Sequence, residues 1–320
     1  AEAAARYAVE HPDYPPLNPA LQLLTYVVAG DMLHFVARLP MQLSGSAIAL
    51  GVYGAVATAA GGRAGGVAGA LAVAALLGQE WFRVAAQSGM SDGMVAAGLL
   101  LAAAWWASWR DGRRRRDAAC AALMTAFLAS SKHEGALLAT LLGLVVLAAE
   151  LRARGRDALR SVAVLAPLSA LVPPAAHVAC LRRLGASNDM VEGLAAPDRA
   201  ATAVARIPEV AALTWERLVS LSEAGGALVV AAPIVALLAA RRGASSAVLI
   251  GAWTAALGGA AYFAVFLLTP RELRWHFESA APRLCGHLVP TALVALATAA
   301  CAAAGTRGDA RAPAATVEAD

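Results

Sequence analysis

Charge is scarce in this sequence, and lysine is almost missing from it. Asp, Glu, Lys and Arg make up 15% of the 320 residues, against 59% hydrophobic residues, whereas about a quarter of a soluble protein is charged. Lys132 is the single lysine among 26 lysine and arginine residues. Short arginine clusters between apolar runs account for the net charge of +4, so we expect no nucleic-acid partner.

Cysteine and metal-binding patterns are equally sparse. The four cysteines are scattered without a C-x-x-C pair, and we interpret them as small buried hydrophobic residues. No His/Cys cluster has the spacing of a metal site. The glycines of residues 61–66 lack both a preceding strand and a following Lys-Ser/Thr, which excludes a P-loop. We therefore expect no resident cofactor, although a divalent cation remains an option.

Long apolar runs fill most of the chain, and the mean hydropathy is +0.61. A helix needs about 20 apolar residues to cross a bilayer. We predict an all-α, polytopic transmembrane helical bundle of about nine spans with interfacial helices, forming a single integral membrane domain over residues 1–304. The predicted spans are residues 33–60, 67–81, 93–109, 118–131, 135–149, 162–180, 226–240, 247–268 and 284–304.

Other segments are predicted to lie outside the spans. Residues 17–28 would form a helix of about 18 Å, which is too short to cross and is predicted to lie at the membrane interface. Residues 182–223 form an extracytoplasmic loop region with amphipathic helical patterns, and residues 269–283 form a polar loop. Residues 305–320 are small and charged, and we predict a disordered cytoplasmic tail.

Arginine sidedness gives the predicted orientation. If the spans alternate, the arginine clusters of residues 110–117, 151–160 and 241–243 fall on one side, which the positive-inside rule makes cytoplasmic. The polar residues 130–135, inside the apolar run 118–149, then form the tip of a hairpin on the outer side. Each arm has about 15 residues, roughly 22 Å of helix against a hydrocarbon core of about 30 Å. This places the tip below the outer surface.

The hairpin tip carries Lys132, His133 and Glu134. Ionisable groups at this depth usually serve function, and an ammonium beside an imidazole could bind a phosphate or pyrophosphate while Glu134 orients them. The alternative is a polar hairpin that snorkels to the interface.

Three further groups are candidates for substrate binding on the outer side, each with a simpler alternative. Asp13 and Tyr14 lie in a proline-rich turn that could be turn chemistry alone. Asp92 opens a span, where capping of the helix dipole is the default role. Arg274 and His276, in the loop that also carries Arg271 and Arg283, could clamp a phosphate or be ordinary solvated charge. The lone histidines His177 and His287 are interpreted as structural, and the helix start with Asp31, His34 and Arg38 as an exposed polar face.

The order of these motifs resembles the bacterial polytopic glycosyltransferases of the GT-C class, the relatives of protein O-mannosyltransferases and of lipid A aminoarabinose transferase. Four pieces over most of residues 10–300 carry the resemblance. They are His11-Pro12-Asp13-Tyr14-Pro15-Pro16-Leu17, Ser91-Asp92, Ser131-Lys132-His133-Glu134-Gly135 and Thr269-Pro270-Arg271-Glu272-Leu273-Arg274-Trp275-His276. The family often has Asn or Pro where this chain has His133.

The resemblance implies an inverting enzyme of the bacterial inner membrane. It would move a hexose or pentose from a polyprenyl-phosphate donor to a lipid, glycan or protein acceptor on the outer face, with membrane lipids as further partners. Lys132 would meet the lipid phosphate. The catalytic carboxylate is expected in a first outer loop that follows an earlier span. The chain starts at Ala1, so we expect this Asp to lie upstream of residue 1 and the sequence to be a fragment.

Two other functions are compatible with the sequence. A transporter or flippase of lipid-linked or amphipathic solutes would share the many spans, but such proteins commonly repeat a broken helix in both halves, and no second copy of the run 118–149 is found. A catalytically inactive, scaffold-like relative is the other possibility.

Overall fold

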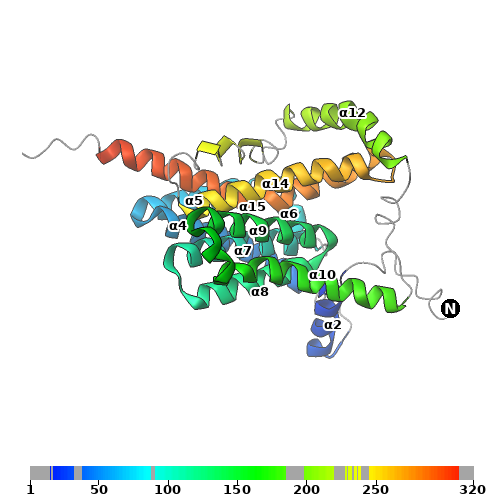
Figure 1. Ribbon diagram of the computed structural model, residues 1–320, viewed down its shortest axis with the longest axis horizontal. Helices are drawn as coiled ribbons and strands as arrows, with labels where there is room; N and C mark the ends of the chain where they lie inside the picture. The colour runs from blue at the N-terminus through cyan, green and yellow to red at the C-terminus, as the bar shows by residue number, and fades with distance from the viewer. Residues whose placement is uncertain are drawn as a thin grey trace, which may run out of the picture.

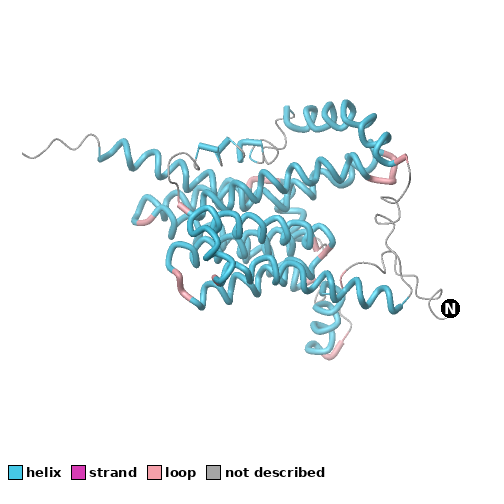
Figure 2. The backbone as a smooth tube through the Cα atoms, viewed as in Figure 1, coloured by secondary structure: helices cyan, strands magenta, loops and turns pink. Residues whose placement is uncertain are grey.

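The computed structural model confirms the predicted all-α class (Figure 2). It describes residue 15, residues 17–31, 38–87, 91–184, 198–219 and 245–309, and part of 228–238. All regular structure in these residues is helical. The predicted turn at Asp13 and Tyr14 and part of the predicted span 226–240 lie outside them.

Most helices run along one direction and form a bundle (Figure 1). Helices α4 (Leu39–Ala60) and α5 (Gly62–Leu77) form a pair, and α6 (Glu80–Gln87) leads toward α7 (Asp92–Gly112). Next come α8 (Arg115–Ser131), α9 (His133–Arg154), the short 3₁₀ helices η1 (Gly155–Arg160) and η2 (Val162–Val164), and α10 (Leu165–Leu184). Helices α12 (Arg199–Val219), α14 (Ser246–Leu268) and α15 (Leu273–Asp309) complete the described elements.

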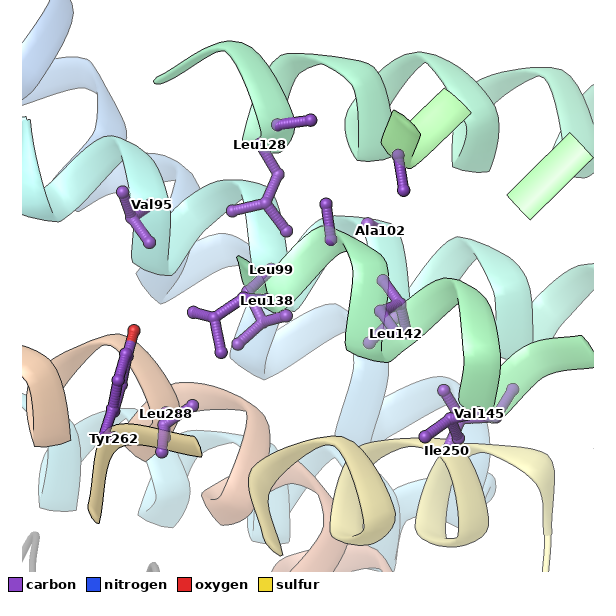
Figure 3. Close-up of a cluster of buried hydrophobic side chains, with 14 of the residues drawn as sticks. Val95, Leu99, Ala102, Leu128, Leu138, Leu142, Val145, Ile250, Tyr262 and Leu288 are labelled. Carbon is purple, nitrogen blue, oxygen red and sulfur yellow. The ribbon is translucent and has the colours of Figure 1, made fainter. Parts of the chain in front are cut away.

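Helix α7 lies at the centre of the bundle, because it contributes to both large buried clusters. One cluster joins α7 to α8, α9, α14 and α15 through residues such as Leu99, Leu128 and Leu138 (Figure 3). The other joins α7 to α4, α5 and α15 through Leu100 and Val52. A Cβ at Gly98 would lie 3.1 Å from the Leu128 Cβ, so a glycine here allows α7 and α8 to approach closely.

Five helical segments of the described chain are long and apolar enough to cross a membrane, which indicates a membrane protein. They are Leu39–Ala60, His133–Arg160, Val162–Arg183, Ser246–Leu268 and Leu273–Ala304. The prediction of nine spans is not confirmed. The predicted span 67–81 ends at Leu77 in the 16-residue helix α5, while α8 has 17 residues and begins with Arg115, Arg116 and Asp117.

The predicted hairpin of residues 118–149 is present, but its arms are longer than expected. Helix α8 has 17 residues and α9 has 22, because the arginine-rich flanks continue the helices instead of forming loops. The break falls at Lys132, whose extended backbone (φ −168°, ψ 165°) separates the two helices. The short-arm argument for the depth of the tip is therefore wrong, although the position of the break is right.

Two segments predicted as irregular are helical. Residues 273–283, predicted as a polar loop, form the first three turns of α15. The Glu272 carboxylate accepts hydrogen bonds from the backbone N–H groups of Arg274 and Trp275, which caps this helix start. At the other end, α15 continues to Asp309, so residues 305–309 of the predicted disordered tail are helical. The rest of the tail lies outside the described residues.

Two amphipathic segments, in residues 17–28 and 182–223, contain helices that bury little of their surface. Helix α2 (Leu17–Ala29) has no buried residue and lies across the direction of the bundle (Figure 1), as a helix in the membrane plane would. In α12, Val210 and Leu213 are buried while Trp215 is 66% exposed. Arg199 and Arg206 of α12 donate to the carbonyl of Thr269 at the end of α14, which satisfies a helix-terminal acceptor.

Candidate functional site

One buried carboxylate collects polar side chains from three other parts of the bundle. Asp92, the first residue of α7, has a side chain that is 4% exposed. Its Oδ1 accepts hydrogen bonds from Lys132 Nζ at 3.1 Å and from His287 Nε2 at 2.9 Å. Arg283 Nη1 lies 3.8 Å from the other carboxylate oxygen. We call Asp92, Lys132, His287, Tyr262 and Arg283 the Asp92 cluster.

Lys132 reaches Asp92 because of the break between α8 and α9. Its extended backbone directs the side chain into the bundle, where it is 6% exposed. Glu134, the second residue of α9, lies 3.5 Å from the same ammonium and is 27% exposed. A Cβ at Gly135 would overlap the Leu128 carbonyl, so only glycine allows the hairpin to close this tightly.

His287 and Tyr262 extend the cluster between α15 and α14. His287 is fully buried, and its Nδ1 lies 2.8 Å from the Tyr262 hydroxyl. A neutral imidazole satisfies both contacts if Nε2–H donates to Asp92 and Nδ1 accepts from Tyr262. Tyr262 itself is 4% exposed and lies beside Leu288 in the apolar cluster of Figure 3. The hydroxyl therefore fixes one ring orientation of His287.

The formal charges of the site balance. With a neutral imidazole, the carboxylates of Asp92 and Glu134 offset the cations of Lys132 and Arg283. Buried charges are tolerated in this way, in pairs with hydrogen bonds. Lys132 has a partner within the protein, the Asp92 carboxylate, and its contact with a lipid phosphate stays a prediction. Arg283 is 41% exposed, so it is the cation of the cluster that water and an anionic ligand reach most easily.

The Asp92 cluster is buried within the bundle, toward the end that carries the hairpin tip, residues 131–135. Helix α15 continues past the cluster toward this end, over about 20 Å between His287 and its first residue, Leu273. The opposite end carries the arginine-rich residues 110–116 and 151–160, where Arg110 contacts Glu150 and Ser246. We call these the hairpin end and the arginine end.

The structure unites only some of the candidate residues. Asp92, Lys132 and Glu134 come together, although Asp92 and Lys132 belong to different predicted elements. His133 lies near His177 of α10, with ring centroids 6.3 Å apart. Arg274 points away, is 61% exposed and pairs with Glu278 at 3.8 Å. Asp13 and Tyr14 are outside the described residues.

His276 occupies a different environment from the Asp92 cluster. It is partly buried, with its ring 5.4 Å from that of Phe266. Its Nδ1 is buried without a hydrogen-bond partner among the described residues. His276 lies seven residues before Arg283 on the same face of α15 and within electrostatic range of Arg283 and Glu134, whereas Arg274 pairs with Glu278.

Sequence reasoning missed two members of the cluster. His287 was interpreted as structural, and Tyr262 was not considered. The available signal was weak but present: Arg283 and His287 are four residues apart and so share a helix face, and a histidine within an apolar run requires a hydrogen-bond partner.

The Asp92 carboxylate does not act mainly as a helix cap. Its partners are side chains of the hairpin and of α15, although its place in the first turn of α7 still suits the helix dipole. No group of three or more His, Cys, Asp or Glu residues in the described parts of the chain is arranged to hold a metal ion.

Comparisons with known proteins identify no relative. No protein-family model, no curated protein and no solved structure matches this chain.

Proposed function

We propose that this chain is a membrane glycosyltransferase that moves a sugar from a polyprenyl-phosphate donor to a lipid, glycan or protein acceptor at the hairpin end, on the extracytoplasmic face of a bacterial inner membrane. The observation that carries the proposal is the Asp92 cluster, in which a buried ammonium and a half-exposed guanidinium flank one carboxylate inside the bundle. The order of sequence motifs described above supports the same assignment.

The chemistry of such a transfer fits these groups. Departure of a lipid phosphate needs cations that stabilise its negative charge, and Arg283 is positioned to make the first contact with a phosphate oxygen. Lys132 contributes when the phosphate replaces Glu134, the more exposed of its two carboxylate partners. Asp92 and His287 then hold Lys132 in place. Low solvent exposure strengthens all of these interactions.

Replacement of Lys132 tests the proposal. In the full-length protein, Lys132→Ala is expected to abolish release of polyprenyl phosphate from a radiolabelled short-chain polyprenyl-phosphate hexose or pentose, because the buried charge that stabilises the leaving phosphate is gone. Membrane insertion should persist. Arg156→Ala, at an exposed position of the arginine end, is the matched control and should retain activity.

A second variant separates loss of function from loss of folding. Arg283 is 41% exposed, so Arg283→Ala should cost little stability while raising KM for the donor about tenfold, the equivalent of about 1.4 kcal/mol. Unchanged turnover and KM in both variants would remove the phosphate-binding role.

Ion-coupled transport is the second candidate, because one observation favours it. A buried carboxylate shared by lysine and histidine inside a bundle is also the arrangement of proton relays in transporters. Uptake of a lipid-linked or amphipathic solute into proteoliposomes, dependent on a pH gradient and lost in Asp92→Asn, would favour this alternative over glycosyl transfer.

A further inference from the structure

A cavity lies at the arginine end, away from the Asp92 cluster. Its volume is about 620 Å³, and α4, α7, α8, α14 and α15 contribute its lining. Leu100, Thr291 and Val294 are among its lining residues. Asp92, Lys132 and His287 are not among its lining residues. Any occupant therefore belongs to a separate site.

The cavity has the length of one membrane leaflet. Its lining on α7 runs from Leu100 to Gly112, which corresponds to about 18 Å of helix. Half of a bilayer's hydrocarbon core is about 15 Å. Small residues such as Gly51, Gly54 and Ala104 form its walls, and a Cβ at Gly54 would meet no atom within 4 Å. This leaves a mainly apolar space along α7.

The mouth of the cavity is polar and carries both signs of charge. Ser108, Asp111, Arg114 and Asp117 line it at the arginine end. Ser108 donates a hydrogen bond to Asp117 at 2.7 Å, and Ser246 donates to Asp111. Asp111 and Arg114 are exposed. A carboxylate and a guanidinium that line the same mouth complement a head group that carries an ammonium and a phosphate.

We propose that this cavity holds one hydrocarbon chain of a zwitterionic phospholipid with a primary ammonium, drawn from the leaflet at the arginine end. The chain fills the space between α4 and α7, the ammonium meets Asp111, and the phosphate meets Arg114. Hydrocarbon is the medium around membrane-spanning helices at this depth, so an apolar cavity of leaflet length takes up a chain without exposing apolar surface to water.

Photocross-linking of the intact protein tests this site. The protein is placed in nanodiscs that contain phosphatidylethanolamine with a diazirine near the end of one chain, and labelled residues are mapped by peptide mass spectrometry. We expect labelling of α4 and α7 around Gly54 and Ala104. Gly54→Leu should remove it, because the new side chain occupies the open space while leucine favours the helix.

Gly66→Leu is the matched control. Gly66 lies on α5, does not line the cavity, and has only the Tyr53 hydroxyl within 4 Å of a Cβ, at 3.8 Å. The variant Gly66→Leu should leave the labelling of α4 and α7 intact. Labelling that persists in Gly54→Leu, or reaction of Gly54→Cys with a membrane-impermeant thiol reagent in a background without the native cysteines, would overturn the lipid site. Equal labelling by phosphatidylglycerol would overturn the assignment of the head group.

Discussion

Two buried carboxylates, one at each end of the bundle, are held by different sets of side chains. Glu150 at the arginine end is fully buried and receives Arg113 Nη1 at 2.8 Å, Arg113 Nη2 at 3.0 Å and Arg110 Nε at 3.2 Å. Both arginines come from the end of α7 and remain charged at any physiological pH. Asp92 at the hairpin end is held by a lysine and a histidine from two separate elements, with a tyrosine behind the histidine.

This difference separates a structural clamp from an adjustable site. Arg113 ends α7 with a left-handed backbone (φ 54°), and its guanidinium lies 4.9 Å from the Trp109 ring centroid, so packing and a forked hydrogen bond fix it. Lysine and histidine change protonation and hydrogen-bond partners more readily. The comparison therefore predicts that both carboxylates support folding, whereas only Asp92 supports activity.

The largest effect is expected from Asp92→Ala. Removal of the carboxylate leaves the buried ammonium of Lys132 with the more distant Glu134, and loss of one partner of a buried pair costs about 3–5 kcal/mol. Both the melting temperature in detergent and turnover should fall. The double variant Asp92→Asn/Lys132→Met removes the charge imbalance and should recover much of the melting temperature without recovering turnover. Recovered turnover in the double variant would contradict a functional role for the pair.

Glu150→Gln is expected to have a smaller effect on stability and none on chemistry. Arg113 is 43% exposed and Arg110 is 18% exposed, so water replaces some of the hydrogen bonds that the carboxylate made to them. The free energy of unfolding should fall by about 1–3 kcal/mol. Thermal unfolding should report this loss while turnover per folded molecule stays unchanged. Glu209→Gln, at an exposed position of α12, is the control that should change neither. Loss of turnover in Glu150→Gln would break the distinction between the two ends.

The two ends also differ in how far the sequence predicted them. Apolar runs and arginine sidedness placed the break at Lys132 and put Asp92 at the same end, because both depend on local composition. The partner of Asp92 that is 195 residues away, His287, depends on how α7 and α15 pack, which no local pattern encodes. Tyr262 lies in an apolar run and resembles a core residue in the sequence, so only the contact of its hydroxyl with His287 shows that it belongs to the Asp92 cluster.

The start of α15 shows the same limit in the fold. Polar residues predicted a loop over residues 269–283, yet the segment from Leu273 onward is helical and contains Pro282. Leu273, Phe277 and Ala280 recur at helical spacing and are buried, and packing of this face outweighs the low helix propensity of a single proline. A periodic apolar face of three residues was too short to recognise among the charges.

Tyr262→Phe is the smallest of these changes and tests the Asp92 cluster at the hairpin end. It removes one hydroxyl from a buried site, and the lost hydrogen bond to His287 should cost about 1 kcal/mol. His287 Nδ1 loses the contact that fixes its ring, so the hydrogen bond from His287 to Asp92 weakens. We therefore expect turnover to fall by more than the loss of folded protein explains. Tyr53→Phe, on the 45% exposed Tyr53 of α4, is the matched control and should change neither quantity. Equal, proportionate losses of folded protein and turnover in Tyr262→Phe would assign Tyr262 to packing alone, and would make the hairpin end a second structural clamp like the arginine end.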